Sequence, residues 1–90
     1  GMSGKDRTSI IVSAKNQPGS LYHMLKPLAE NGVDMSRIES RPSKTTNWEY
    51  LFFLDIIGHQ QDASVQQALQ ALHQEANMVK VLGSYPMGIA

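Results

Sequence analysis

The residue types that most often carry catalysis are thinly spread in this chain. Ser20 is followed by His23, but the G-x-S-x-G turn that exposes a nucleophilic serine is missing. The histidines His23, His59 and His73 have neither the i, i+4 spacing of a zinc pair nor a cysteine beside them. No two carboxylates are spaced as a general acid and base. We therefore expect no catalytic residues, no metal site and no cofactor.

One segment, running from Asn16 to Leu21, offers chemistry through its backbone. The N–H groups of Gly19, Ser20 and Leu21 are expected in the first turn of a helix, without intrahelical acceptors. Unpaired N–H groups and the helix dipole both favour a small carboxylate there. The Asn16 side-chain oxygen could accept a hydrogen bond from an ammonium group. An ordinary β–α turn has the same features, so residue chemistry alone leaves both interpretations open.

Composition limits the function classes that remain. The 90 residues include eight basic and eight acidic side chains and no cysteine, with 41% hydrophobic and 18% charged residues. A neutral chain lacks the basic face of most nucleic-acid-binding modules. No apolar run approaches the roughly 20 residues that cross a bilayer, so we expect no membrane contact and a cytoplasmic location. The low charge suggests that part of the surface contacts a partner.

Six elements must position these residues, in the order strand, helix, strand, strand, helix, strand. Pro18 suits the first turn of a helix, and Asp62 or Ser64 suits an N-cap. The expected elements are strand Thr8–Ala14, helix Pro18–Glu30, strand Val33–Pro42, strand Trp48–Ile57, a helix ending near Asn77, and strand Met78–Tyr85. We expect residues 1–7 to be a tag remnant and linker, 8–86 the domain, and 87–90 a tail.

Local irregularities are expected at three points. Leu21, Leu25, Leu28 and Ala29 form an apolar helical stripe, and Pro27 within it predicts a kink. A left-handed cap is expected at residues 31–32, which are Asn-Gly. The mixed parity of the apolar residues in 33–42 predicts a β-bulge or a late start of the strand.

The element order predicts an α+β, ferredoxin-like βαββαβ sandwich, with a four-stranded antiparallel sheet and two helices on one face. The segment Trp48–Ile57 is apolar on both faces of its strand. Helices cover one face, so Leu51, Phe53 and Ile57, or their neighbours of opposite parity, need another cover. We expect a second copy or a neighbouring domain there, and therefore a homodimer or higher homo-oligomer.

Two motifs are specific enough to suggest a family. Residues 38–42 read IESRP, and residues 47–55 read NWEYLFFLD. This pairing resembles the ACT domain of prephenate dehydratases, and the match to those fused to chorismate mutase is the best. The segment from Asn16 to Leu21 stands where the family has a glycine-alanine-leucine motif, with Ser20 in place of the alanine. The resemblance covers about residues 8 to 86.

The resemblance implies a feedback sensor that binds L-phenylalanine between two ACT domains and inhibits a separate dehydratase domain of the parent chain. Two alternatives remain: the regulatory domain of an aromatic amino acid hydroxylase, which has a similar ESRP stretch, and a dimerisation module without a ligand. The implied ligand-binding residues are Asn16, Pro18, Gly19, Ser20, Leu21, Glu39, Ser40, Arg41 and Pro42.

Overall fold

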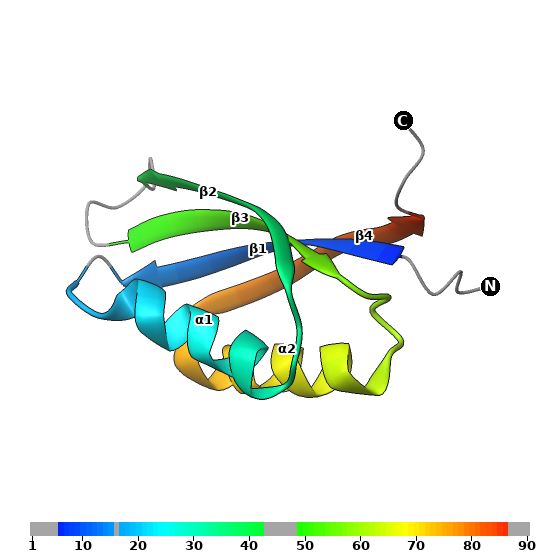
Figure 1. Cartoon of the computed structure of the whole chain (residues 1–90). Coiled ribbons are helices and arrows are strands. Elements are labelled where there is room, and N and C mark those ends of the chain that lie inside the picture. The colour runs from blue at the N-terminus through cyan, green and yellow to red at the C-terminus, as the bar shows by residue number, and fades with distance from the viewer. Residues whose placement is uncertain (1–5, 16, 43–48, 87–90) are drawn as a thin grey trace.

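The fold has the six elements that the sequence predicts, in the predicted order (Figure 1). The structure is a computed structural model that describes residues 6–15, 17–42 and 49–86. Asn16 and residues 43–48, which include Trp48 at the expected start of a strand, lie outside the described residues. The elements are β1 (Asp6–Lys15), α1 (Ser20–Glu30), β2 (Met35–Pro42), β3 (Glu49–Ile57), α2 (Ala63–Glu75) and β4 (Met78–Pro86).

The four strands form one antiparallel sheet in the order β2-β3-β1-β4. Both helices lie on the same side of this sheet, and the other side is open (Figure 1). The predicted ferredoxin-like sandwich is therefore confirmed. In the central pair, Ile11 of β1 lies opposite Phe53 of β3, and Val12 lies opposite Phe52. Because side chains alternate across a strand, Ile11 and Phe53 share the open face while Val12 and Phe52 face the helices.

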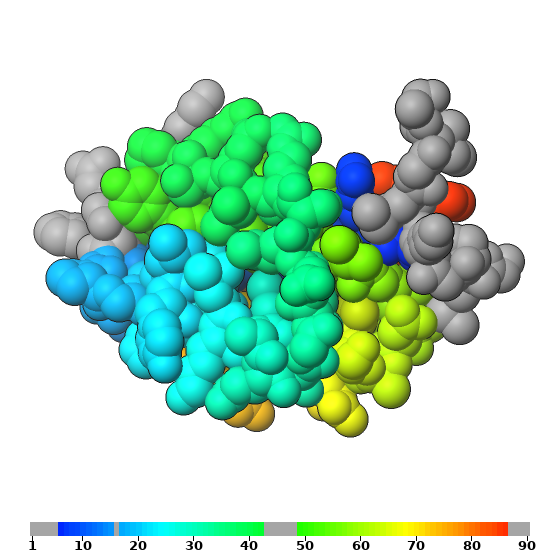
Figure 2. Space-filling view, viewed as in Figure 1, coloured from blue at the N-terminus to red at the C-terminus, as the bar shows by residue number. Residues whose placement is uncertain are grey.

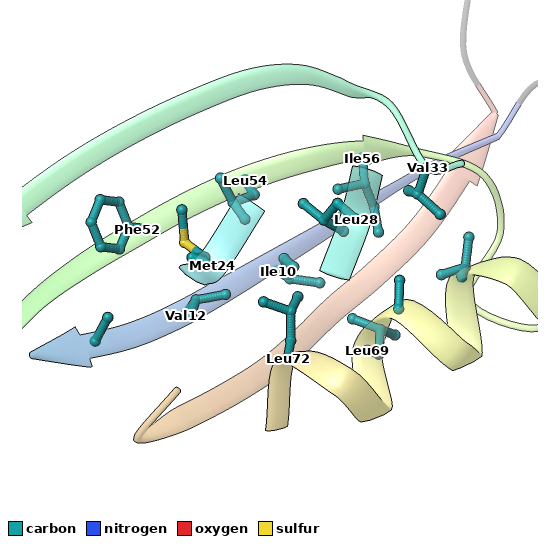
Figure 3. Close-up of a cluster of buried hydrophobic side chains, with 13 residues drawn as sticks. Ile10, Val12, Met24, Leu28, Val33, Phe52, Leu54, Ile56, Leu69 and Leu72 are labelled. Carbon is teal, nitrogen blue, oxygen red and sulfur yellow. The ribbon is translucent and has the colours of Figure 1, made fainter. Parts of the chain in front are cut away.

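The hydrophobic core fills the layer between sheet and helices (Figure 3). Ile10 and Val12 of β1 and Leu54 and Ile56 of β3 are at most 1% exposed. Leu72 of α2 packs against them and is fully buried. The core thus takes one face of each of these strands and one stripe of α2. The core consists of Ile10, Val12, Ala14, Met24, Leu28, Val33, Phe52, Leu54, Ile56, Val65, Ala68, Leu69 and Leu72.

Helix α1 differs from the prediction in its start and in the face that it buries. It begins at Ser20, because Gly19 before it has a φ of 87°, outside the helical range. The buried residues of α1 are Met24, Pro27 and Leu28, whereas Leu21 is exposed. Met24, which is outside the predicted stripe, is only 2% exposed. The helix is continuous through Pro27, whose ring contributes to the buried side.

The predicted left-handed cap of α1 is confirmed as a Schellman motif. The N–H of Val33 donates to the carbonyl of Leu28 at 2.8 Å, and the N–H of Gly32 donates to Ala29 at 3.1 Å. Gly32 has a φ of 68°, which glycine adopts without a steric penalty. This cap turns the chain directly into β2.

The start of β1 and an irregularity in β2 can also be compared with the predictions. Strand β1 begins at Asp6, two residues earlier than expected, so Asp6 and Arg7 belong to the sheet and not to a linker. The predicted bulge in β2 is confirmed as a register shift between Met35 and Arg37. Within the described ranges, no helix is long and apolar enough to cross a membrane.

Candidate functional site

The turn between β1 and α1 is held together by its own hydrogen bonds. The Ser20 hydroxyl donates to the carbonyl of Lys15 at 2.6 Å. The N–H of Ser20 donates to the carbonyl of Gln17 at 3.2 Å, and that of Gln17 donates to Lys15 at 3.0 Å. The serine that replaces the family's alanine therefore anchors the turn with its hydroxyl.

The N–H of Ser20 thus has an acceptor, contrary to the expectation that it would be free. The first helical hydrogen bond runs from the N–H of His23 to the carbonyl of Gly19, at 3.0 Å. The N–H groups of Leu21 and Tyr22 precede that bond and lie at the positive end of the helix dipole. The turn can still favour an anion, but through the N–H groups of Leu21 and Tyr22.

A pocket of about 260 Å³ joins the two segments that the sequence singled out. Ser20 and Leu21 come from the β1–α1 turn, and Ser40 comes from the IESRP segment of β2. Figure 2 shows the surface of β2 (green) directly above that of α1 (cyan). The full lining is Lys15, Gln17, Ser20, Leu21, Ser40, Tyr50 and Phe52.

The lining combines one cationic group with apolar and aromatic walls. Lys15 supplies the positive charge, next to the start of α1. The rings of Tyr50 and Phe52 lie 6.3 Å apart between centroids. Ser20, Ser40 and Gln17 add hydroxyl and amide groups to the lining. The pocket can therefore hold a small molecule that has a carboxylate at one end and an apolar group at the other.

Two of the predicted site residues, Glu39 and Arg41, are not at this pocket. They flank Ser40 in β2, and strand alternation places them on the open face of the sheet. There Glu39 accepts a hydrogen bond from Arg37 at Oε1, and its Oε2 lies 3.5 Å from Nη2 of Arg41. The Arg41 guanidinium lies over the Phe53 ring, 5.3 Å from its centroid.

The charged side chains of Arg37, Glu39 and Arg41, which form a row on the open face of the sheet, stabilise one another. The hydrogen bond from Arg37, followed by its positive charge, lowers the pKa of the Glu39 carboxyl. The same hydrogen bond and the charge of Glu39 raise the pKa of Arg37. Arg41 contributes a smaller lowering to Glu39. Glu39 and Arg41 thus form an ion-paired row with Arg37, on the face opposite the pocket.

The remaining predicted residues flank the pocket. Pro18 and Gly19 form the turn before α1, and Pro42 pairs with Tyr50 across the sheet. Asn16 lies outside the described residues. Sequence reasoning missed Tyr50 and Phe52 as site residues. The alternation of β3 offers a signal for them, since both share its helix-facing parity near the ESRP motif.

The described residues contain no group of three or more histidine, aspartate or glutamate side chains that could hold a metal ion. His23 Nδ1 of α1 lies 4.0 Å from a carboxylate oxygen of Glu75 of α2, and both side chains are at least half exposed. Such exposed pairs contribute little to stability.

Comparison with known proteins identifies the family of this chain. The ACT domain family model matches residues 8–74. The chain is 52% identical to the bifunctional chorismate mutase/prephenate dehydratase of Neisseria gonorrhoeae, over 99% of this chain and 25% of that protein.

Two solved structures share the fold along nearly all of the chain. Prephenate dehydratase from Arthrobacter aurescens in complex with L-Phe has a TM-score of 0.86 and 35% identity, over 100% of this chain and 32% of that one. The quorum-quenching acylase GqqA has a TM-score of 0.87 and 32% identity, over 93% of this chain and 30% of that one. The chain thus spans about a quarter to a third of these proteins. It belongs to the ACT domain family.

Proposed function

We propose that this chain is the regulatory domain of a prephenate dehydratase and that it binds L-phenylalanine in the pocket between the β1–α1 turn and β2. The observation that carries the proposal is that this pocket joins Ser20 and Leu21 of the turn with Ser40 of the IESRP segment. The relative from Arthrobacter aurescens, 35% identical, has a structure in complex with L-Phe.

The dimensions and chemistry of the pocket suit one amino acid. Its volume of about 260 Å³ lies just below the roughly 300–1,000 Å³ of pockets for drug-sized ligands. The ligand carboxylate is attracted by Lys15 and by the first turn of α1, where helix N–H groups and a cation act together. The phenyl ring packs against Leu21 and the rings of Tyr50 and Phe52. Asn16, which lies outside the described residues, is the candidate for the ammonium group.

A second copy completes the site. The pocket is open to solvent, and three exposed apolar side chains lie on the two elements that border it. Leu21 and Tyr22 on α1 are 46% and 62% exposed, and Ile38 on β2 is 41% exposed. Strand β2 is also an edge strand of the sheet. A copy packed along this edge covers these side chains and encloses the ligand.

Micromolar affinity is physically reachable at such a site. Burial of a phenyl group contributes roughly 2–3 kcal/mol, and each charged hydrogen bond adds about 1.5–3 kcal/mol before ordering costs. Together these approach the roughly 8 kcal/mol of a micromolar complex. Inhibition of a dehydratase domain then requires that L-phenylalanine prefers one arrangement of the dimer, because a ligand that binds two states equally shifts neither.

Calorimetry with L-Phe, L-Tyr and D-Phe tests the proposal. L-Phe should bind most tightly, because a buried tyrosine hydroxyl without a partner costs about 1–3 kcal/mol and D-Phe reverses the arrangement around the α-carbon. Leu21→Ala should weaken L-Phe binding about tenfold, since it removes apolar contacts worth roughly 1–2 kcal/mol.

The matched control is Leu82→Ala, which removes the same side chain from a position that is 55% exposed on the open face. That variant should bind L-Phe like the wild-type chain. The proposal fails if millimolar L-Phe gives no heat with a confirmed dimer, or if both variants weaken binding equally.

A further inference from the structure

The Ser20 hydroxyl differs from the other hydroxyl groups of the ligand pocket because its hydrogen already has an acceptor. It donates to the carbonyl of Lys15 at 2.6 Å. The hydroxyls of Ser40 and Tyr50, which line the same pocket, make no hydrogen bond to another described residue. A serine hydroxyl has one hydrogen and two acceptor lone pairs. The Ser20 oxygen therefore offers only its lone pairs to a ligand.

The helix that Ser20 begins does not use this oxygen. Gly19 is the residue before the helix, and no side chain caps the N-terminus of α1. Among the described residues, no N–H or O–H group donates to the Ser20 hydroxyl oxygen. Ser20 is half-buried and lines the pocket. Its lone pairs are thus available where the ligand is proposed to bind.

The backbone carbonyls of the turn are less available as acceptors. The carbonyl of Lys15 accepts from the Ser20 hydroxyl and also from the N–H of Gln17 at 3.0 Å. A carbonyl oxygen has two lone pairs, so both are in use. The Gln17 carbonyl accepts from the N–H of Ser20, and the Gly19 carbonyl accepts from His23. The serine hydroxyl thus replaces the Lys15 carbonyl as the open acceptor of the turn.

An acceptor without a free hydrogen is suited to an ammonium group, which has three hydrogens and no lone pair. Hydrogen bonds from a charged donor are about twice as strong as neutral ones. The bond to the Lys15 carbonyl also polarises the hydroxyl and makes its oxygen a better acceptor. In an α-amino acid the carboxylate and the ammonium share one carbon. A carboxylate at the N–H groups of Leu21 and Tyr22 therefore brings the ammonium next to Ser20.

We propose that the Ser20 hydroxyl oxygen accepts a hydrogen bond from the ammonium group of the ligand, and that it selects α-amino acids over aromatic carboxylates that lack an amino group. This inference rests on the proposed function and adds a specificity-determining residue to it. The alanine at this place in the family motif has no oxygen for that role. The ammonium has three hydrogens, so Ser20 can act together with a second acceptor.

Calorimetry with L-Phe and with 3-phenylpropanoate, which has the same ring and carboxylate but no ammonium, tests this inference. Ser20→Ala should weaken L-Phe binding about tenfold to hundredfold, as expected for loss of one hydrogen bond to a charged group. It should change the binding of 3-phenylpropanoate much less. Ser20→Thr keeps the hydroxyl and should restore the preference for L-Phe. A role limited to anchoring the turn would weaken both ligands by the same factor.

The matched control is Ser64→Ala, which removes a hydroxyl from an exposed position of α2 outside the pocket. Both affinities should stay at their wild-type values. The inference is overturned if Ser20→Ala binds L-Phe like the wild type, if it weakens both ligands equally, or if the wild-type chain binds both equally tightly. In each of these cases L-Phe still binds the wild-type chain, so the proposed function stands. A wild-type chain that does not bind L-Phe overturns both.

Discussion

At the scale of single residues, the side chains of the ESRP motif lie on both faces of one strand, β2. Ser40 lines the pocket, while Glu39 and Arg41 join Arg37 in an ion-paired row on the open face. The motif is contiguous in sequence, so a resemblance assigns all of its residues to one site. Strand alternation separates them. We infer that Glu39 and Arg41 act on the ligand indirectly, by holding β2 in place.

The pKa of Glu39 provides a test of this row. Its pKa is lower in the folded chain than in the unfolded chain. The pairing therefore favours folding above the unfolded-state pKa, and this contribution is lost as the pH falls through the folded-state pKa. NMR titration of the Glu39 carboxyl should give a midpoint below the ordinary value of 4.5.

Two variants test which of the two arginines lowers the pKa of Glu39 more. Arg37→Gln should raise the Glu39 midpoint more than Arg41→Gln does, because Arg37 supplies both the stronger hydrogen bond and the larger charge effect. Equal midpoints in wild type and Arg37→Gln would show that the pair does not form in solution.

Residue-scale prediction from the sequence succeeded where a local rule applied. The Asn-Gly pair at 31–32 gives the left-handed cap through the conformational freedom of Gly32. It failed for Lys15, Tyr50 and Phe52, which line the pocket from two strands. The alternation of β3 gives the face on which Tyr50 and Phe52 lie, but their place in the pocket depends on the three-dimensional approach of β3 to the β1–α1 turn, which no local pattern contains.

At the scale of elements, a buried hydroxyl connects three parts of the chain. Thr8 of β1 is fully buried, and its hydroxyl donates to the carbonyl of Gly58 at 2.7 Å. It also bonds with the Ser84 hydroxyl of β4 at 2.7 Å. Ser84 in turn accepts a hydrogen bond from the N–H of Gln60 at 3.0 Å. This network attaches the loop between β3 and α2 to the two neighbouring strands.

Thr8→Val should destabilise the domain by about 1–3 kcal/mol, because it leaves buried polar partners without a hydrogen bond while it keeps the side-chain shape. For a domain of this size, each kcal/mol lowers the melting temperature by about 4–8 °C. Thr8→Ser keeps the hydroxyl and should lose less stability in thermal unfolding. A Val variant as stable as the wild type would show that the network is dispensable.

The order and type of all six elements follow from the sequence, because apolar periodicity and turn residues agree along the chain. The face that α1 buries does not follow from the sequence. Its leucines predict a stripe through Leu21, whereas the helix buries Met24, Pro27 and Leu28. Packing against the sheet selects that face, and Leu21 is left beside the pocket.

At the scale of the whole molecule, the strand that is apolar on both faces buries one face in the core and leaves the other only partly covered. Phe52, Leu54 and Ile56 of β3 contribute to the core of one copy. Leu51 and Phe53 on the opposite side are only half-buried. The low charged fraction of the chain agrees with a surface that is partly interface. A ligand enclosed between copies then links its own binding to assembly.

This linkage gives the last prediction, on thermal stability. A ligand that binds the folded state at 100 times its Kd stabilises it by about 2.7 kcal/mol. For a domain of this size, this raises the melting temperature by roughly 10–20 °C. L-Phe should give such a shift in differential scanning fluorimetry, and D-Phe should give much less. If the ligand binds between two copies, the melting temperature with L-Phe should also rise with protein concentration, because unfolding then releases separate chains. Leu21→Ala should reduce the shift, and Leu82→Ala should retain it. A shift in melting temperature that does not depend on protein concentration would place the ligand within one copy. Equal shifts with L-Phe and D-Phe would argue against a site that distinguishes the two enantiomers.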